Sequence, residues 1–125
     1  MIYKVLTLNE WQSAKELGKI VTNIDQNDGF VHLSTSSQLS ATLSMYFKAS
    51  DKVMLLQINY EKVKKLLRLE PTSPSSSRGG SFYHLYGELL MEYVSKDWLL
   101  DRGAFNVPEE ILIQAEIDNL KKLQL

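Results

Sequence analysis

An apolar run in the middle of the chain, from Val53 to Ile58, places the strongest constraint on the fold. Every residue in this run except Gln57 is apolar. A strand with one face in water alternates apolar and polar side chains, whereas a strand covered on both faces is apolar almost throughout. The run therefore predicts a central strand that is buried on both sides.

The segments around this run mix strand and helix patterns without a regular alternation. The expected strands are 2–6, 30–33, 89–94 and 98–100, and the expected helices are 9–17, with Asn9 as its N-cap and Gly18 as its stop, and about 37–48. Residues 19–28 are expected to be irregular, and 70–81, rich in proline, serine and glycine, to be a mobile loop. This mixture predicts the α+β class, with a mixed or mostly antiparallel sheet.

The length of the chain is that of one compact domain. A chain of 125 residues is long enough for one hydrophobic core and too short for two. We predict a single α+β domain over residues 1–107. An amphipathic helix over 108–125 is expected to follow it and to pack on the domain or on a partner.

Charge and residue usage exclude several classes of protein. Fourteen basic and fifteen acidic residues give a net charge of -1, and this lack of a basic excess argues against general nucleic-acid binding. The absence of cysteine excludes disulfides, thiol catalysis and zinc–thiolate sites. The N-terminus lacks a signal-peptide pattern, and no segment approaches the roughly 20 apolar residues that span a bilayer. We therefore expect a cytoplasmic protein with no membrane partner.

Two matched segments carry the only histidines of the chain. Residues 30–35 read Phe-Val-His-Leu-Ser-Thr, and residues 82–86 read Phe-Tyr-His-Leu-Tyr. Side chains on a strand alternate between its two faces. Residues expected to share one face are Phe30, His32 and Ser34 in the first segment, and Phe82, His84 and Tyr86 in the second.

This histidine pair allows several interpretations. Each histidine could be a half-buried sheet residue without a chemical role. The pair could bind a metal together with Asp25 or Asp28, but no metal-ligand spacing supports this, and no metal is expected. Ser34 could be a hydrolase nucleophile, but no nucleophile-elbow pattern surrounds it. The remaining interpretation is a polar binding site, because imidazole can donate, accept or carry charge at neutral pH.

The loop before the second histidine segment adds a feature that suits an anion. Arg78-Gly79-Gly80 precedes this segment directly, and both guanidinium and glycine amides suit phosphate. Tyr86 offers a phenol that could stack on a ring or bond a ribose hydroxyl, or could be an ordinary sheet tyrosine. These residues and the two histidines predict a polar pocket for a nucleotide-like ligand.

Several pieces of the chain together match a known family: Ile2-Tyr3-Lys4-Val5, Trp11 with Ala14 and Gly18, residues 28–35 with Gln38, Leu55 to Ile58, 77–80 and 82–87. Through these pieces, over about its first hundred residues, the chain resembles DUF952, a small bacterial family of domains of unknown function. The chain departs from the family where Tyr83 and Glu88 replace its usual prolines, and in a longer loop before Arg78. The helix after Pro108 lies outside the core of the family.

The resemblance implies a fold like that of ADP-ribosyltransferases, a split mixed sheet with a cleft for a nicotinamide dinucleotide. It also implies similarity to the RNA 2'-phosphotransferases, which carry a His-Leu-Ser/Thr strand. NAD is therefore the candidate cofactor. Some members of the family have histidine where Lys4 stands, a position that this resemblance aligns with the motif histidine of the transferases. Candidates for the glutamate that many transferases use are Glu70, Glu88 and Glu92.

The leading hypothesis is a domain that binds NAD or a related nucleotide, with an ADP-ribosyl- or phosphotransferase-like reaction as its candidate activity. His32 and His84 are the candidate catalytic residues. Ser34, Arg78 and Tyr86 are the candidate ligand-binding residues. His32 and Ser34 are expected to hold the ribose or nicotinamide side and Arg78 the phosphate, while His84 and Tyr86 form the opposite wall.

Two alternatives belong to other functional classes. One is a non-catalytic module that binds a small anionic metabolite in the same pocket. The other is an interaction protein that forms a homodimer through its terminal helix. Loss of the dimer after deletion of residues beyond Phe105 is the expected result for the second alternative.

Overall fold

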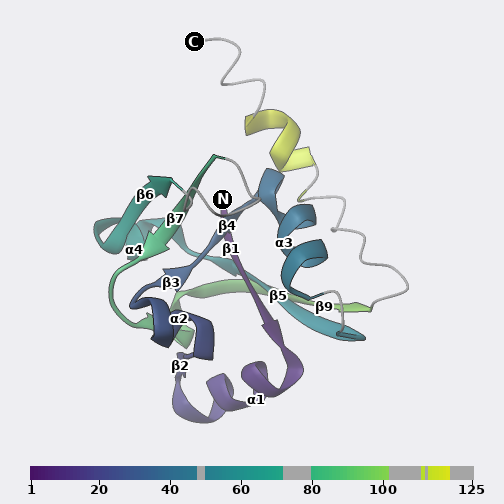
Figure 1. Ribbon diagram of the computed structural model, residues 1–125, viewed down its shortest axis with the longest axis vertical. Helices are drawn as coiled ribbons and strands as arrows, with labels where there is room; N and C mark the ends of the chain where they lie inside the picture. The colour runs from purple at the N-terminus through teal and green to yellow at the C-terminus, as the bar shows by residue number, and fades with distance from the viewer. Residues whose placement is uncertain (48–49, 72–79, 102–110, 112, 119–125) are drawn as a thin grey trace.

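The computed structural model describes residues 1–47, 50–71, 80–101, 111 and 113–118 (Figure 1). Its strands are β1 (Ile2–Thr7), β2 (Lys19–Ile20), β3 (Val31–His32), β4 (Ser34–Thr35), β5 (Lys52–Ile58), β6 (Leu67–Pro71), β7 (Ser81–Leu85), β8 (Leu89–Leu90) and β9 (Val94–Asp101). Its helices are α1 (Leu8–Leu17), α2 (Asn23–Asp28), α3 (Leu39–Tyr46) and α4 (Tyr60–Val63), with 3-10 turns at Ser36–Gln38, Lys64–Leu66 and Met91–Tyr93.

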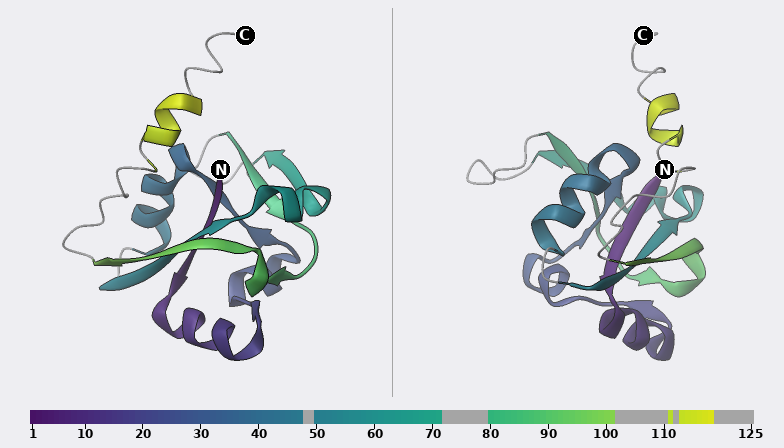
Figure 2. Two further views of the ribbon diagram at one scale, coloured as in Figure 1. Left: turned by 180° about the vertical axis from the view of Figure 1, so that it is seen from behind. Right: turned by 90° about the vertical axis from the view of Figure 1, so that its right-hand side faces the viewer.

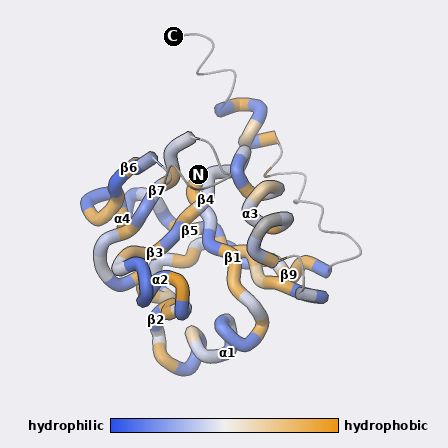
Figure 3. Tube along the Cα trace, viewed as in Figure 1, coloured by the Kyte–Doolittle hydropathy of each residue, from blue (hydrophilic) through white to orange (hydrophobic). Residues whose placement is uncertain are grey.

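The main sheet has four strands in the order β4-β1-β5-β9, and every pairing in it is antiparallel. β5 lies between β1 and β9. Its side chains alternate between two core clusters, because Met54 and Leu56 belong to one and Val53 and Leu55 to the other. The prediction of a central strand buried on both faces is confirmed. Figure 3 shows hydrophobic stretches along the strands of this sheet.

Different elements cover the two faces of the main sheet (Figure 2). On one face, Leu39 and Leu43 of α3 pack against the sheet. On the other face, Ala14 of α1 joins Val31 and Leu85, which come from a second group of strands. The core therefore has two layers, and the histidine strands belong to the second.

The remaining described strands form two smaller antiparallel sheets. One has three strands in the order β3-β7-β6, and the other pairs β2 with β8. The α+β class and a sheet split into several parts are confirmed. Every described pairing is antiparallel, so the mixed character expected for the sheet is absent from the described strands.

The first helix begins earlier than its sequence pattern predicts. Thr7, not Asn9, is the N-cap of α1, and its hydroxyl accepts from the amide of Glu10 while the Glu10 carboxylate accepts from the amide of Thr7. This reciprocal capping box satisfies two free amides at once, which a lone Asn9 cap does not. The predicted stop at Gly18 is confirmed, because Gly18 is left-handed with φ of 76°.

The segment 19–28, predicted to be irregular, contains β2 and the helix α2. Thr22 caps α2, with its hydroxyl accepting from the amide of Asp25, and the left-handed Gly29 ends it. The sequence of this polar segment shows no apolar stripe from which a helix could be predicted, because a six-residue helix is stabilised by its two caps. α2 carries Asp25 and Asp28, the two carboxylates that lie beside His32.

The loop predicted over 70–81 is shorter at both ends than expected. Glu70 and Pro71 belong to β6, and Ser81 begins β7. β6 pairs with β7 along five residues, from Leu67 opposite Leu85 to Pro71 opposite Ser81. A proline is tolerated there because β6 is the outer strand of its sheet and Pro71 is its last residue.

The terminal segment is described only in part. Ile111 is buried in the same cluster as Leu39 and Leu43, and residues 113–118 are helical with Ile113 and Ile117 exposed. Residues 102–110, 112 and 119–125 lie outside the described part, so the predicted domain boundary at 107 and the predicted homodimer stay predictions. Within the residues that the structure describes, no helix is both long and apolar enough to cross a membrane.

Candidate functional site

The two histidines meet on one face of the three-stranded sheet. His32 of β3 pairs directly with His84 of β7 in the antiparallel register, and the ring centres are 5.6 Å apart. Residues directly opposite on neighbouring strands share a face. His32 and His84 therefore stand side by side on one wall, which corrects the expectation that they face each other across the pocket.

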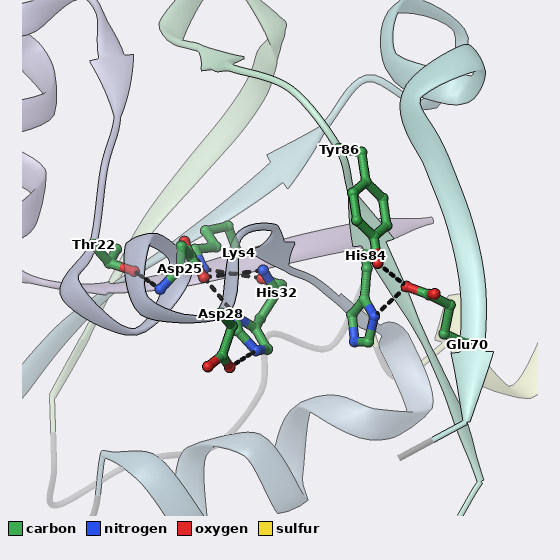
Figure 4. A network of polar contacts seen from close by, with 8 residues as sticks. All are labelled: Lys4, Thr22, Asp25, Asp28, His32, Glu70, His84 and Tyr86. Atoms are coloured by element: carbon green, nitrogen blue, oxygen red, sulfur yellow. Dashed lines mark hydrogen bonds and ion pairs between the residues drawn. The ribbon is translucent and has the colours of Figure 1, made fainter. Parts of the chain in front are cut away.

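His32 lies between two carboxylates (Figure 4). Its Nδ1 is 2.7 Å from Oδ1 of Asp25, and its Nε2 is 2.9 Å from Oδ2 of Asp28. Both carboxylates come from α2, and Asp25 also accepts from the backbone amide of His32 at 3.0 Å. Both ring nitrogens of His32 therefore lie at hydrogen-bond distance from a carboxylate oxygen.

Lys4 extends this group into the core. Its ammonium is 2.7 Å from Oδ2 of Asp25 and donates to the carbonyl oxygen of His32 at 3.0 Å. Lys4 and Asp25 are 5% and 6% exposed, so their ion pair is shielded from water. Burial lowers the pKa of Lys4, although the charge of Asp25 opposes this shift. Burial alone would raise the pKa of Asp25, but hydrogen bonds from His32 and the charge of Lys4 lower this pKa to about 2.

Acid is expected to remove the stabilisation that ionised Asp25 contributes. Its pKa lies at about 2 in the folded protein against 3.8 ordinarily, so the contribution is complete above the ordinary value and is lost as the pH falls to about 2. This shift corresponds to about 2 kcal/mol. Urea unfolding should show the stability gap between wild type and Asp25→Asn narrowing by this amount from neutral pH to strong acid. A gap of constant size would contradict the assignment.

His84 belongs to a second group, with Glu70 and Tyr86. Its Nδ1 is 2.8 Å from Oε1 of Glu70, and the Tyr86 hydroxyl donates to the same oxygen at 2.7 Å. The hydrogen bond from Tyr86, and after it the one from His84, lowers the pKa of Glu70. The hydrogen bond between Tyr86 and Glu70 also raises the pKa of Tyr86. Glu70 is therefore ionised at neutral pH, and it holds two side chains of the β7 segment with one oxygen.

Aromatic contacts join the two groups. The Phe30 ring stacks on His84 with centres 4.0 Å apart and an interplanar angle of 23°. It also lies 4.7 Å from the centre of His32 and 5.5 Å from that of Tyr86. The guanidinium of Arg68 lies 4.5 Å from the centre of the Tyr86 ring, a cation–π distance. Phe30 therefore contacts the rings of both histidine groups.

These residues line a cavity of about 470 Å³. The cavity lies between the histidine sheet, β1, α2 and α3, because its lining includes residues of all four: Tyr3, Lys4, Val5, Glu10, Thr22, Ile24, Asp28, Phe30, His32, Leu33, Ser34, Thr42, Tyr46, Phe47, Glu70, Pro71, Phe82, His84 and Tyr86. Its size is within the range of small-molecule sites, and its wall combines apolar rings with a few converging polar groups.

Ser34 reaches this cavity from a different sheet than expected. The chain changes partner after His32, so Ser34 lies in β4 and pairs with Tyr3 of β1. Its side chain is buried, and its hydroxyl lies 2.7 Å from that of Thr42 in α3. Phe30, His32 and Ser34 therefore line one cavity without belonging to one continuous strand. The strand predicted over 30–33 is confirmed as the shorter β3, but the face that Ser34 was expected to share with Phe30 and His32 is wrong, because the chain leaves β3 at Leu33 and Ser34 belongs to β4.

The other predicted site residues have different outcomes. His32, His84 and Tyr86 all line the cavity, whereas Arg78 lies outside the described residues and its phosphate role stays a prediction. Of the glutamate candidates, Glu70 joins the site and Glu88 pairs with Lys19 at 3.0 Å on the surface.

Sequence reasoning missed the most buried part of the site. The Lys4–Asp25 pair connects residues far apart in the chain, and the sequence alone presents Asp25 only as a possible metal ligand. In the described part of the chain, no group of three or more histidines and carboxylates is placed to hold a metal ion. A lysine at the middle of an apolar strand was the available signal, because a buried charge needs a partner.

The fold and the site define an α+β domain with two histidine–carboxylate groups in one cavity. The chain belongs to the DUF952 family, because residues 5–96 match the family described as "Protein of unknown function (DUF952)". The family prediction is confirmed. No curated protein matches the chain.

Solved structures of one bacterial protein are similar to this chain. The X-ray crystal structure of protein CC0527 from Caulobacter crescentus has 32% sequence identity and a TM-score of 0.74, covering 89% of this chain and 97% of that one. Its solution NMR structure has 35% identity and a TM-score of 0.66, covering 86% and 90%. The likeness to ADP-ribosyltransferases is not tested by these structures and stays a prediction.

Proposed function

We propose that the cavity binds NAD or a related nucleotide, with a planar ring of the ligand against the aromatic wall. The observation that carries this proposal is the combination of stacked rings and carboxylate-held histidines in one cavity of about 470 Å³. Aromatic side chains can stack on any nucleotide base, because every base has a π-face, and a few polar groups then orient the ligand. An ADP-ribosyltransferase-like reaction, implied by the family resemblance, is the candidate activity.

The charges of the cavity favour a ligand with a cationic ring. Glu10, Asp28 and Glu70 bring carboxylates to its lining, while the ammonium of Lys4 is already paired with Asp25. The nicotinamide ring of NAD is a planar cation, which suits both carboxylates and the faces of aromatic rings. A wholly anionic metabolite would meet repulsion from the same groups. The electrostatics therefore favour NAD over the alternative of an anion-binding module.

Calorimetric titration of the full chain tests this proposal. NAD is expected to bind more tightly than ADP-ribose, which has the phosphates but lacks the cationic ring. Phe30→Ala is expected to weaken NAD binding roughly 5- to 150-fold, because one stacking contact contributes about 1–3 kcal/mol. Tyr60→Ala is the matched control, since Tyr60 is an exposed aromatic residue of α4 outside the cavity lining.

Other results of the same titrations would contradict the proposed NAD site. No binding of NAD at millimolar concentration would overturn the proposal. Tighter binding of ADP-ribose than of NAD would favour the anion-binding module instead. Equal weakening by Phe30→Ala and Tyr60→Ala would show that the aromatic wall is not where the ligand binds.

A further inference from the structure

We infer that His84 is a general base, held in position by Glu70, and that the group accepting ADP-ribose is a hydroxyl, either of water or of an alcohol. This inference rests on the proposed function and assigns its acceptor chemistry. It follows from the different hydrogen-bonding states of the two histidines.

Glu70 selects one tautomer of His84. The carboxylate accepts from Nδ1 at 2.8 Å and from the Tyr86 hydroxyl at 2.7 Å, so Nδ1 of His84 must carry a proton. Neutral imidazole then has its lone pair on Nε2. Among the described residues, Nε2 of His84 has no hydrogen-bond partner. A carboxylate that fixes the tautomer of a histidine in this way leaves the other nitrogen free to accept a proton.

The His84 ring is also held still. It is 12% exposed and stacks on Phe30 at 4.0 Å, while its strand pairs with β3 on one side and β6 on the other. Figure 4 shows Glu70 on one side of the ring and the His32 group on the other. His84 is one of the residues that line the cavity, and Nε2 is the ring nitrogen that Glu70 does not bind.

His32 is not placed to act as the general acid that would work together with a His84 base. Both of its nitrogens are occupied, Nδ1 by Asp25 and Nε2 by Asp28. The described site therefore offers one free base and no free imidazole acid. Reactions that expel an alkoxide, such as phosphodiester cleavage, gain from an acid that protonates the leaving oxygen. Release of a pyridinium ring needs no such acid, because the ring leaves as a neutral molecule.

The transfer of ADP-ribose from NAD to a hydroxyl needs only one base from the protein. The acceptor oxygen forms a bond to C1' of the nicotinamide ribose, and the bond from C1' to the ring nitrogen breaks. Its electron pair stays on that nitrogen and neutralises the pyridinium, so nicotinamide leaves without taking up a proton. The hydroxyl proton passes to Nε2 of His84 and from there to solvent. A histidine base suits a hydroxyl acceptor, whereas an arginine acceptor would release its proton far less readily.

The tautomer is testable without any turnover. Long-range proton–nitrogen NMR of the histidine-labelled full chain should show His84 with a proton on Nδ1 and none on Nε2. Glu70→Gln should mix the two tautomers, and Glu88→Gln should leave them unchanged, since Glu88 is a surface glutamate paired with Lys19. A proton on Nε2 in the wild type would overturn the base assignment.

Cleavage of NAD in water with added methanol tests the acceptor. Nicotinamide release should be accompanied by methyl ADP-ribose in proportion to the methanol. His84→Ala should lose roughly 10²- to 10⁴-fold in turnover, the usual contribution of general base catalysis, and added imidazole should restore part of it. Glu70→Gln should lower turnover more than binding and should move the pH profile. Glu88→Gln should behave as wild type.

The outcomes separate the inference from the proposed function. If NAD binds but neither water nor methanol accepts ADP-ribose, the hydroxyl acceptor is wrong. If His84→Ala cleaves NAD at the wild-type rate, the base is wrong although the proposed function stands. If NAD does not bind, the proposed function and the acceptor fall together, and the tautomer measurement still decides whether His84 is built as a base.

Discussion

Replacing Asp25 with asparagine is expected to destabilise the protein by about 3–5 kcal/mol, the usual result of removing one partner of a buried ion pair. Lys4 is 5% exposed, and Asp25 is the carboxylate that pairs with it. Asparagine keeps the shape of the side chain but removes the charge, so the ammonium of Lys4 stays buried without a counter-ion. The hydrogen bonds from the His32 ring and amide also weaken, because their acceptor is no longer ionised.

Urea unfolding at neutral pH, followed by circular dichroism, measures this effect. Asp28→Asn is the matched control, because Asp28 accepts from the same histidine but is 44% exposed. Its pair should contribute less than about 1 kcal/mol, as exposed pairs do. Lys4→Met combined with Asp25→Asn should recover much of the loss by removing the unpaired charge. Equal effects of Asp25→Asn and Asp28→Asn would contradict the structural role of the buried pair.

Replacing Leu56 with alanine is expected to cost about 2–5 kcal/mol of stability, through lost burial and a residual cavity. Leu56 is fully buried in β5, where it faces the cluster that joins the main sheet to the histidine sheet. The void would open in the core cluster that also contains Val31, which precedes His32 in the chain, and Leu85, which follows His84. The backbone that sets the distance between His32 and His84 should therefore loosen as well.

The control for this prediction is Leu99→Ala in the neighbouring strand. Leu99 lies in β9 opposite Met54 but is 54% exposed, so its removal should change stability by no more than about 0.5 kcal/mol. Thermal and urea unfolding of both variants give the comparison. Similar losses for the two leucines would show that the layer between the sheets is not a packed core.

The parts of the fold that sequence predicts are those with a local physical cause. The apolar run of β5 is nearly continuous because both of its faces are covered. Gly18 ends α1 because its left-handed backbone is easy for glycine. Thr35 and Gln38, three residues apart, likewise form a capping box at the start of the turn that leads into α3. Each of these signals lies within a few residues of its effect.

The errors share a different cause, which is tertiary pairing. Placing Phe30, His32 and Ser34 on one strand face assumes one set of neighbouring strands, but His32 pairs with β7 and Ser34 with β1. The switch of sheets at Leu33 depends on where those two strands lie, and no local pattern records it. α2 was missed for a similar reason, because its caps and its contacts stabilise it more than its own composition.

In the site, too, local patterns predict some features, whereas tertiary pairing determines the others. Alternation along a strand predicts that His84 and Tyr86 share a face, and both line the cavity. The partners of the histidines come from distant segments: α2 supplies Asp25 and Asp28, and β6 supplies Glu70. Glutamate candidates could be named from the sequence, but only the pairing of β6 with β7 distinguishes Glu70 from the others.

Nuclear magnetic resonance mapping of NAD on the labelled full chain is the most direct test of the central claim, that one cavity with two histidine groups binds the ligand. The expected result is a set of saturable shifts at Phe30, His32, His84 and Tyr86, absent from the exposed strand residue Leu99 and reduced in Phe30→Ala. Shifts at the surface pair of Lys19 and Glu88 without any at the histidines, or no shifts at millimolar NAD, would contradict the claim.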